Sequence, residues 1–194
     1  MNWFLDRNAD INASCSRDCT PLSWAIGGCA SFSTIHLLFD RGGTISRGQL
    51  LHHAAERELP DRVEVMKFLL EKGAPESINK VMYQDSRDEY VQNMYSGIGT
   101  PLQLAAGKGL LDLVKLLVGH GADPLIKDPR GKIAMDRALY GGHTDVVKFL
   151  HPLSVLDRST PRDDFVDGPG LHFKPMPMEE FLKKGQWKAV LYPE

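Results

Sequence analysis

Several features that would assign a chain to a specialised class are missing from this 194-residue sequence. No apolar run approaches the roughly 18–20 residues that a membrane-spanning helix needs, and the N-terminus lacks the basic segment and apolar stretch of a secretory signal. Only three cysteines occur, Cys15, Cys19 and Cys29, and an odd number close to one end argues against a disulfide framework. The sequence therefore predicts a soluble protein of the cytoplasm or nucleus, with no membrane partner.

An excess of charge of one sign is also missing, since 23 Lys and Arg stand against 25 Asp and Glu, giving a formal net charge of -2. Such a chain has no global attraction to nucleic acid, so no nucleic-acid partner is expected. The sequence lacks the Gly-x-Ser-x-Gly elbow, the phosphate-binding loop, the dinucleotide glycine fingerprint and His-Glu-x-x-His. The cysteine spacings do not match the usual Cys-x-x-Cys pairs of zinc sites. We therefore expect no catalysis, no metal and no cofactor.

A repeat of 33 residues is present instead. Thr-Pro-Leu-Gln-Leu-Ala-Ala begins at Thr100, and the run LDLVKLLV from Leu111 to Val118 has the apolar spacing of a second helix. Gly-Ala-Asp closes the unit at residues 121–123, and the same layout returns from Ile133 to Leu150. A fixed period of this length indicates that each copy is one supersecondary unit stacked on its neighbours.

Two looser copies come earlier, one from Thr20 to Gly43 and one from Gln49 to Ala74. A threonine at the N-cap, a proline at the first helical position and a glycine after the second helix define the helix ends. This pattern resembles the ankyrin repeat. The resemblance implies an all-α solenoid of about four two-helix repeats with hairpin fingers over residues 15–151.

One stretch breaks the period, because Thr100 lies about 18 residues further from Gln49 than one repeat requires. A few of these residues fit the turn near Pro60, and the others predict an enlarged finger at residues 77–97. Long insertions cost little loop-closure entropy, so a tolerated loop is one interpretation. The other is a binding feature, because insertions in solenoids sit on one face, often the binding face.

The two ends depart from the repeat. Residues 1–14 resemble a truncated half-repeat, and Trp3 and Phe4 would leave apolar surface there unless another chain makes end-to-end contact or more of the protein precedes it. Residues 152–194 are rich in proline yet also in aromatic side chains, and residues 178–184 predict a short helix. We expect this tail to dock as a cap on the last repeat, with a position across the concave face as the alternative.

By the resemblance, partners bind the concave groove, at the finger tips and the ends of the first helices. Those positions are mostly basic here, which indicates an acidic protein segment as the partner, because arginine pairs well with carboxylates. The candidate residues, including the tyrosines of the enlarged finger, are Arg17, Arg47, Arg57, Tyr83, Tyr90, Tyr95, Lys108, Arg130, Lys132 and Tyr140. The simpler interpretation is that these charges are only solvated.

The main expectation is thus a non-catalytic protein–protein interaction module. The runner-up is a small-molecule pocket or enzyme, formed where the finger or tail covers the groove near His52, His53 and Tyr95. A third interpretation is a segment of a larger scaffold that merely extends the stack.

Overall fold

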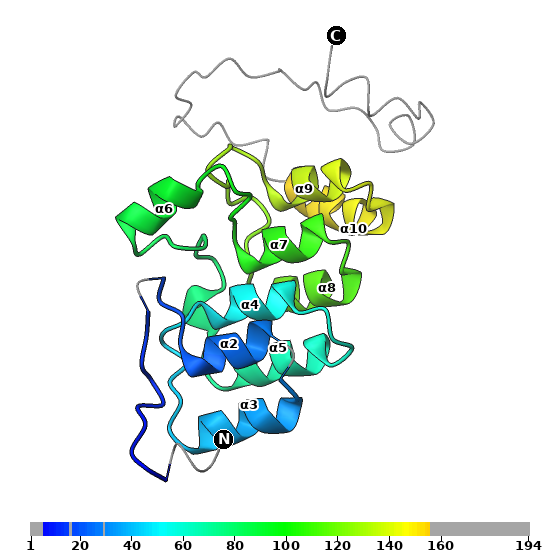
Figure 1. Ribbon diagram of the computed structural model, residues 1–194. Coiled ribbons are helices and arrows are strands. Elements are labelled where there is room, and N and C mark those ends of the chain that lie inside the picture. Colours follow the sequence, from blue (N-terminus) through cyan, green and yellow to red (C-terminus); the bar gives the residue numbers. More distant parts are fainter. Residues whose placement is uncertain (1–5, 16, 29, 156–194) are drawn as a thin grey trace. The chain divides into compact units, whose positions relative to one another are not determined.

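The computed structural model describes residues 6–15, 17–28 and 30–155 (Figure 1). The chain divides into two units between Ser154 and Val155, and the helices described below belong to the first unit. Trp3, Phe4 and the tail beyond residue 155, with its expected helix at 178–184 and its docking as a cap, lie outside the described residues.

The described residues form helices and turns without a strand. Eight of the helices make four antiparallel pairs, and one pair follows another along the stack in Figure 1. The pairs are α2 (Pro21–Gly27) with α3 (Phe32–Asp40), α4 (Leu50–Glu56) with α5 (Arg62–Glu71), α7 (Pro101–Gly107) with α8 (Leu111–Gly119), and α9 (Ala134–Tyr140) with α10 (Thr144–Val155). The predicted all-α ankyrin-type stack is therefore confirmed. The predicted boundary at residue 151 falls inside α10, which continues through Pro152.

Two of the first helices, α2 and α7, begin at a cap that their own sequence supplies. In α2 the Thr20 N–H donates to Ser23 Oγ at 2.7 Å, and the Ser23 N–H donates to Thr20 Oγ1 at 3.2 Å. Thr100 and Gln103 make the same reciprocal pair at the start of α7. Two of the four orphan N–H groups of each helix are satisfied in this way.

The other two first helices begin without a threonine. Ile133 has no side-chain oxygen, and only its N–H is satisfied, by Asp136 Oδ2 at 3.0 Å. Gln49, before α4, has a left-handed backbone with φ of 51° and gives no side-chain cap. Its Oε1 instead accepts the N–H of Tyr83 at 2.7 Å, so this residue ties the second repeat to the enlarged finger.

The core lies between the layer of first helices and the layer of second helices. Pairs of alanines in α4 and α7, such as Ala54–Ala55 and Ala105–Ala106, are fully buried and let neighbouring first helices approach closely. Leucines and isoleucines of both layers fill the space between, with Ile26, Ile35, Leu51, Leu69, Leu113, Leu117 and Leu150 fully buried. Burial of this kind stabilises each repeat through its neighbours more than through itself.

Asparagine side chains join the closing turns of successive repeats. Asn12 Nδ2 donates to the Gly42 carbonyl at 2.9 Å, and its Oδ1 accepts the Thr44 N–H at 2.8 Å. Asn79 makes the same pair of bonds to Gly121 and Asp123, at 3.2 and 2.8 Å. The turns that follow the second helices are thus held in register by the preceding turn.

Basic side chains hold the opposite ends of the first helices. The carbonyls at a helix C-terminus lack intrahelical partners and carry partial negative charge. At three successive junctions a residue of the next repeat donates to them. Arg57 bonds the end of α2, Lys108 Nζ bonds the Glu56 carbonyl of α4 at 2.9 Å, and His143 Nε2 lies 3.0 Å from the Gly107 carbonyl oxygen of α7.

Arg57 makes the most extensive of these contacts and is 1% exposed. Its guanidinium donates to the carbonyls of Ile26, Gly28 and Ala30 at 2.8, 3.1 and 2.7 Å, and it pairs with both carboxylate oxygens of Asp61 at 2.7 and 2.8 Å. The hydrogen bond from Arg57 lowers the pKa of Asp61. The expectation that Arg57 faces a partner in the groove is therefore wrong, because all three guanidinium nitrogens already donate hydrogen bonds inside the stack.

Replacing Arg57 tests this arrangement. We expect Arg57→Ala to lower the free energy of unfolding by about 3 kcal/mol or more, because buried carbonyls and Asp61 lose their donor. Urea unfolding followed by circular dichroism measures the change. Arg87→Ala removes an exposed arginine of α6 (Arg87–Asn93) and should stay within about 0.5 kcal/mol of the unaltered protein. Equal effects of the two substitutions would contradict the structural role of Arg57.

A second stability test concerns His52, which is 1% exposed in α4 with its Nε2 2.9 Å from the Lys80 carbonyl oxygen. Burial lowers the pKa of His52 from 6.5 to about 4, and the hydrogen bond to Lys80 opposes only part of that shift. Between these values the unfolded chain binds a proton that the folded chain does not. The contribution of neutral His52 to stability is thus complete above pH 6.5 and is lost as the pH falls toward 4.

The free energy of unfolding should accordingly fall by at most about 1.4 kcal/mol per pH unit through His52 across this window. His52→Gln keeps a donor for Lys80 but cannot titrate, so its urea unfolding should depend less on pH. Burial also lowers the pKa of the neighbouring His53, so His53→Gln serves as the comparison that measures its separate share. An unchanged slope in His52→Gln would refute this assignment.

Candidate partner-binding surface

The first helices present equivalent side chains on the side that faces away from the second helices. Trp24, His53, Leu104 and Arg137 occupy the same register position in α2, α4, α7 and α9, because each lies four residues after its helix N-cap. One turn later the equivalent positions include Glu56 and Tyr140. Trp24 and Tyr140 are both 71% exposed, so large aromatic groups stand free near the two ends of this row.

The fingers before α2 and α4 carry two of the predicted residues, and both are ion-paired. Arg17 Nε lies 3.8 Å from Glu89 Oε2, although 66% of the Arg17 side chain is exposed. Arg47 Nε lies 3.4 Å from Asp18 Oδ1, and its Nη2 donates to Ser14 Oγ at 2.8 Å. The Arg47–Asp18 pair is exposed on both side chains, so it is worth little energy and exchanges easily for a partner's carboxylate, whereas the Glu89 side chain is only 14% exposed.

The last finger is shaped by one aspartate. Asp128 Oδ1 accepts the backbone N–H groups of Arg130 and Lys132, each at 2.8 Å, and the Asp128 N–H donates to the Lys132 carbonyl at 2.8 Å. This closed turn directs two cations outward at its tip, and both residues are exposed. The Arg130 guanidinium also donates to the carbonyl of Tyr95, so the enlarged finger and the last finger are in contact.

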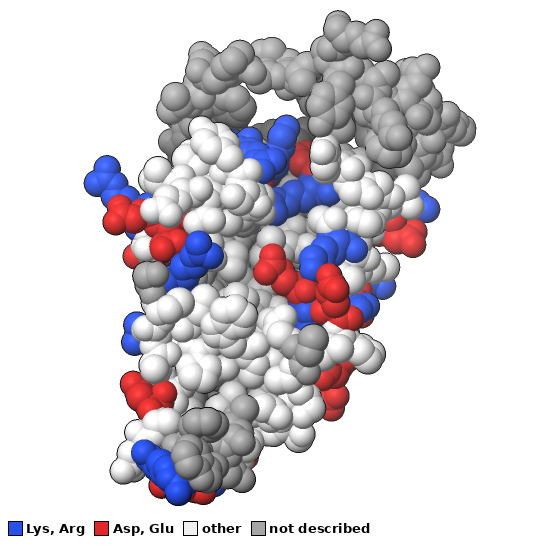
Figure 2. All heavy atoms as spheres, viewed as in Figure 1, with Lys and Arg blue, Asp and Glu red and all other residues white. Residues whose placement is uncertain are grey.

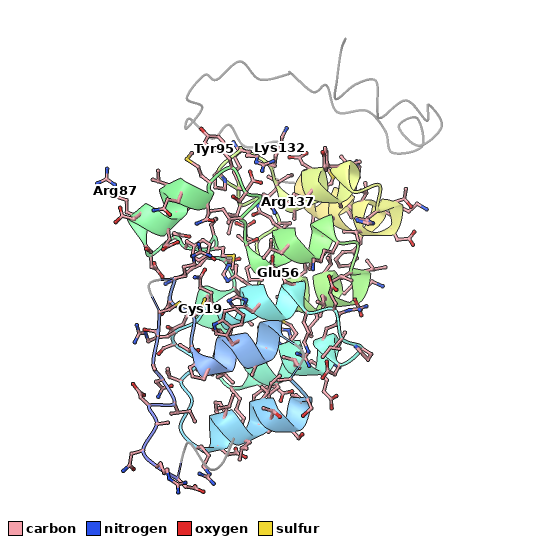
Figure 3. The ribbon with its side chains drawn as sticks, viewed as in Figure 1. Cys19, Glu56, Arg87, Tyr95, Lys132 and Arg137 are labelled. Atoms are coloured by element: carbon pink, nitrogen blue, oxygen red, sulfur yellow. The ribbon has the colours of Figure 1, made fainter. Side chains whose placement is uncertain are left out.

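Arg137 supports these two fingers from α9. Its Nη2 and Nε bond Asp128 Oδ2 at 2.7 and 3.1 Å, and the rest of the fork donates to the carbonyls of Gly97 and Ile98. Figure 3 shows Arg137 close to Lys132 and Tyr95, between α9 and the finger bases. Sequence reasoning missed Arg137. The sequence did contain a sign of this role. Arg137 is the fourth residue of a first helix, and Asp128, nine residues before it, follows the closing turn of the preceding repeat.

The enlarged finger is folded, and only some of its tyrosines face solvent. Val81, Met82 and Ile98 form a small apolar cluster of their own, and Tyr83 and Tyr90 pack against it as half-buried side chains. Burial raises the pKa of Tyr83 accordingly. The tip is formed by α6 (Arg87–Asn93), which has no buried residue. Tyr95, in the turns just after α6, is 77% exposed and is the tyrosine of this finger most accessible to a partner.

The surface is mixed in charge. Figure 2 shows basic side chains over α9 and the adjoining fingers and acidic ones nearer α4. Glu56 is the acidic residue that Figure 3 places on α4. Lys108, expected as a basic anchor, is exposed but already engaged, since its Nζ bonds the Glu56 carbonyl and lies 3.8 Å from Glu58 Oε1.

The pocket near His52, His53 and Tyr95 gains no support from these contacts. His52 is buried in α4 with its ring bonded to Lys80, whereas Tyr95 is 77% exposed and bonded through its carbonyl to Arg130. Within residues 6–155, apart from the two undescribed positions, no three His, Cys, Asp or Glu are placed to hold a metal ion. In the same part of the chain no helix is long and apolar enough to cross a bilayer.

Comparisons with known proteins agree with the geometry. The family model described as ankyrin repeats (3 copies) matches residues 81–155. The Notch-regulated ankyrin repeat-containing protein B of Danio rerio is 33% identical over 46% of this chain and 81% of its own length, and the Xenopus tropicalis Notch-regulated ankyrin repeat-containing protein is 33% identical over 47% and 81%.

A plant relative, the probable E3 ubiquitin-protein ligase XBOS34 of Oryza sativa subsp. japonica, is 33% identical over 68% of this chain. Three such plant proteins are matched over only 14% to 22% of their own length. What these relatives share with the chain is the repeat, a structure that generally mediates protein–protein interaction and is typically non-catalytic. The paired helices, the capping boxes and these matches together show that the chain belongs to the ankyrin-repeat family.

Proposed function

We propose that this chain is a non-catalytic protein-interaction module whose binding surface is the exposed side of the first helices together with the finger tips. We call this surface the helix-and-finger face. Its anchors are Trp24, Tyr140, Tyr95, Arg130 and Lys132, all exposed. The observation that carries the proposal is the exposure of Trp24 and Tyr140, each 71%, on first helices at separate levels of the stack.

Exposed aromatic side chains of this size are unusual on a surface that only needs to be soluble. Trp, Tyr and Arg are the residues that most often dominate binding energy, because they bury a large area with few rotatable bonds. An extended segment that contacts Trp24 and Tyr140 would cross the intervening α4 and α7. The repeats would therefore bind an extended segment of several partner residues rather than a single residue.

The partner is proposed to be acidic toward the last finger. Arg130 and Lys132 are both exposed at the tip, where they would meet carboxylates without displacing an internal carboxylate partner. Arg17, Arg47 and Lys108 would contribute after exchanging their ion-pair partners Glu89, Asp18 and Glu58. Tyr83 and Tyr90 would act indirectly, by supporting the finger that carries Tyr95.

The extent of the module is also part of the proposal. Residues 15–151 would supply the repeats and residues 77–97 the enlarged finger. The compartment would be cytoplasmic or nuclear.

Selection of linear peptides from a random library on the immobilised full chain tests the charge of the partner. We expect enriched peptides to be rich in Asp and Glu and to bind about tenfold more weakly to the double variant Arg130→Glu/Lys132→Glu, with a smaller salt dependence. The matched control is Lys67→Glu/Lys148→Glu, which changes the charge equally on exposed positions of the second helices α5 and α10. Enriched peptides without an excess of acidic residues would refute the acidic partner.

The same peptides test the aromatic anchors separately. Because Trp24 and Tyr140 are mostly exposed, alanine at either position should change the unfolding free energy by less than about 1 kcal/mol while weakening peptide binding by about tenfold or more. Lys67→Ala, at an exposed position of the second helix α5, is the control for loss of an exposed side chain outside this face. If peptides bind Trp24→Ala and Tyr140→Ala as tightly as the unaltered protein, the helix-and-finger face is not the binding surface.

A further inference from the structure

Two of the three thiols of the chain lie in the first finger. Cys15 and Cys19 lie four residues apart, and the Cys15 N–H donates to the Cys19 carbonyl at 3.2 Å while the Asp18 N–H donates to the Cys15 carbonyl at 3.0 Å. A direct hydrogen bond between their main chains keeps the two residues close across the turn. Disulfides join cysteines whose Cα atoms lie within about 7 Å of each other, so this turn favours a bond between the two sulfurs.

The two side chains differ in their surroundings. Cys15 is exposed, whereas Cys19 is half-buried and its thiol donates to the Arg17 carbonyl, with a sulfur–oxygen distance of 3.7 Å. The interaction between the two thiols lowers the pKa of Cys15 and raises the pKa of Cys19. The finger thus carries one thiol exposed to solvent, Cys15, and one half-buried thiol, Cys19.

The two sulfurs are also unequal as acids. Hydrogen bonds from the backbone N–H groups of Arg17 and Cys19 lower the pKa of Cys15. Burial raises the pKa of Cys19 to about 11, with the neighbouring Cys15 adding to that rise. An exposed thiol that ionises readily, beside a second thiol, is the arrangement found in cysteines that react with oxidants and are then resolved by a neighbour.

We propose that Cys15 and Cys19 form an oxidation site at which a hydroperoxide converts the two thiols into an intramolecular disulfide. The Cys15 thiolate attacks one peroxide oxygen, the O–O bond breaks, and hydroxide leaves, so that Cys15 becomes a sulfenic acid. The Cys19 sulfur then attacks the Cys15 sulfur, and the S–O bond breaks as water leaves. The two thiols lose two electrons and two protons, and hydrogen peroxide is reduced to two molecules of water.

The site is reversible by thiols and agrees with the expectation that the chain has no permanent disulfide framework. It lies beside contacts that hold the first two fingers together, since the Asp18 carboxylate accepts the Gly48 N–H at 2.8 Å and pairs with Arg47. Disulfide formation can be measured on the protein alone. The inference therefore does not depend on the proposed partner.

The chain offers a direct test, because trypsin cuts after Arg17, between the two cysteines. In a Cys29→Ser full-length variant, hydrogen peroxide followed by blocking of free thiols and trypsin should yield peptides 8–17 and 18–41 joined by a bond that reduction breaks. The intact protein should lose the mass of two hydrogen atoms. Cys15→Ser/Cys29→Ser and Cys19→Ser/Cys29→Ser are the matched controls and should yield no joined pair.

The rate decides whether the fold creates the site. We expect the joined peptides to form about tenfold faster in the folded protein than in urea, and iodoacetamide to alkylate Cys15 faster than Cys19 at neutral pH. If Cys29→Ser does not fold, chymotrypsin cleavage after Trp24 separates Cys19 from Cys29 in the unaltered chain and gives the same readout. Absence of the joined pair, equal rates in urea or equal alkylation of the two thiols would each overturn the proposal.

Discussion

Carbonyl groups at the C-terminal ends of the first helices are the groups on which the stack depends. A helix of seven residues leaves most of its carbonyls without an N–H partner, and burial makes that costly. At each junction a cationic or hydrogen-bonding side chain of the next repeat supplies the donor, through Arg57, Lys108 and His143. Each repeat is thereby completed by its successor, which makes the stack a chain of nearest-neighbour contacts. The junctions are unequal, because Arg57 is buried and bonded to several carbonyls, whereas Lys108 is exposed and bonded to one.

The same constraint positions the fingers. Arg137 donates to carbonyls at the base of the enlarged finger while pairing with Asp128, and Gln103 Nε2 donates to the carbonyls of Ile126 and Lys132 at 2.6 and 3.0 Å. Side chains of the first helices therefore hold the loops from which Tyr95, Arg130 and Lys132 project. A surface held in this way loses little conformational entropy when a partner binds, and its anchors can remain exposed in the free protein.

The parts of the structure that could be predicted are those formed by interactions between residues a few positions apart in the sequence. Thr100 and Gln103 are three residues apart, so the start of α7 follows from local chemistry. Gln49 breaks the Thr-Pro pattern, and its actual role, a bond to the Tyr83 backbone, involves a residue 34 positions away. The enlarged finger was located by counting residues. The packing of Tyr83 and Tyr90 depends instead on an apolar cluster that joins Ile98 to Val81 and Met82 and that Ile126 contacts from the last finger.

Sequence alone determined the architecture of this protein, because a 33-residue period with Thr-Pro openings and glycine endings can bury its apolar faces only by stacking. It also determined where the period fails and which positions lie at finger tips. Tertiary structure decided which of those tip and helix-end residues are available. Arg57 and Lys108 occupy the same position in successive repeats, yet one is buried and the other exposed, because the direction of a long side chain is set by the unsatisfied carbonyls of the neighbouring repeat. Whether such a side chain is buried or exposed depends on its distance from the carbonyls of the neighbouring repeat, and the spacing of residues along the chain does not give that distance.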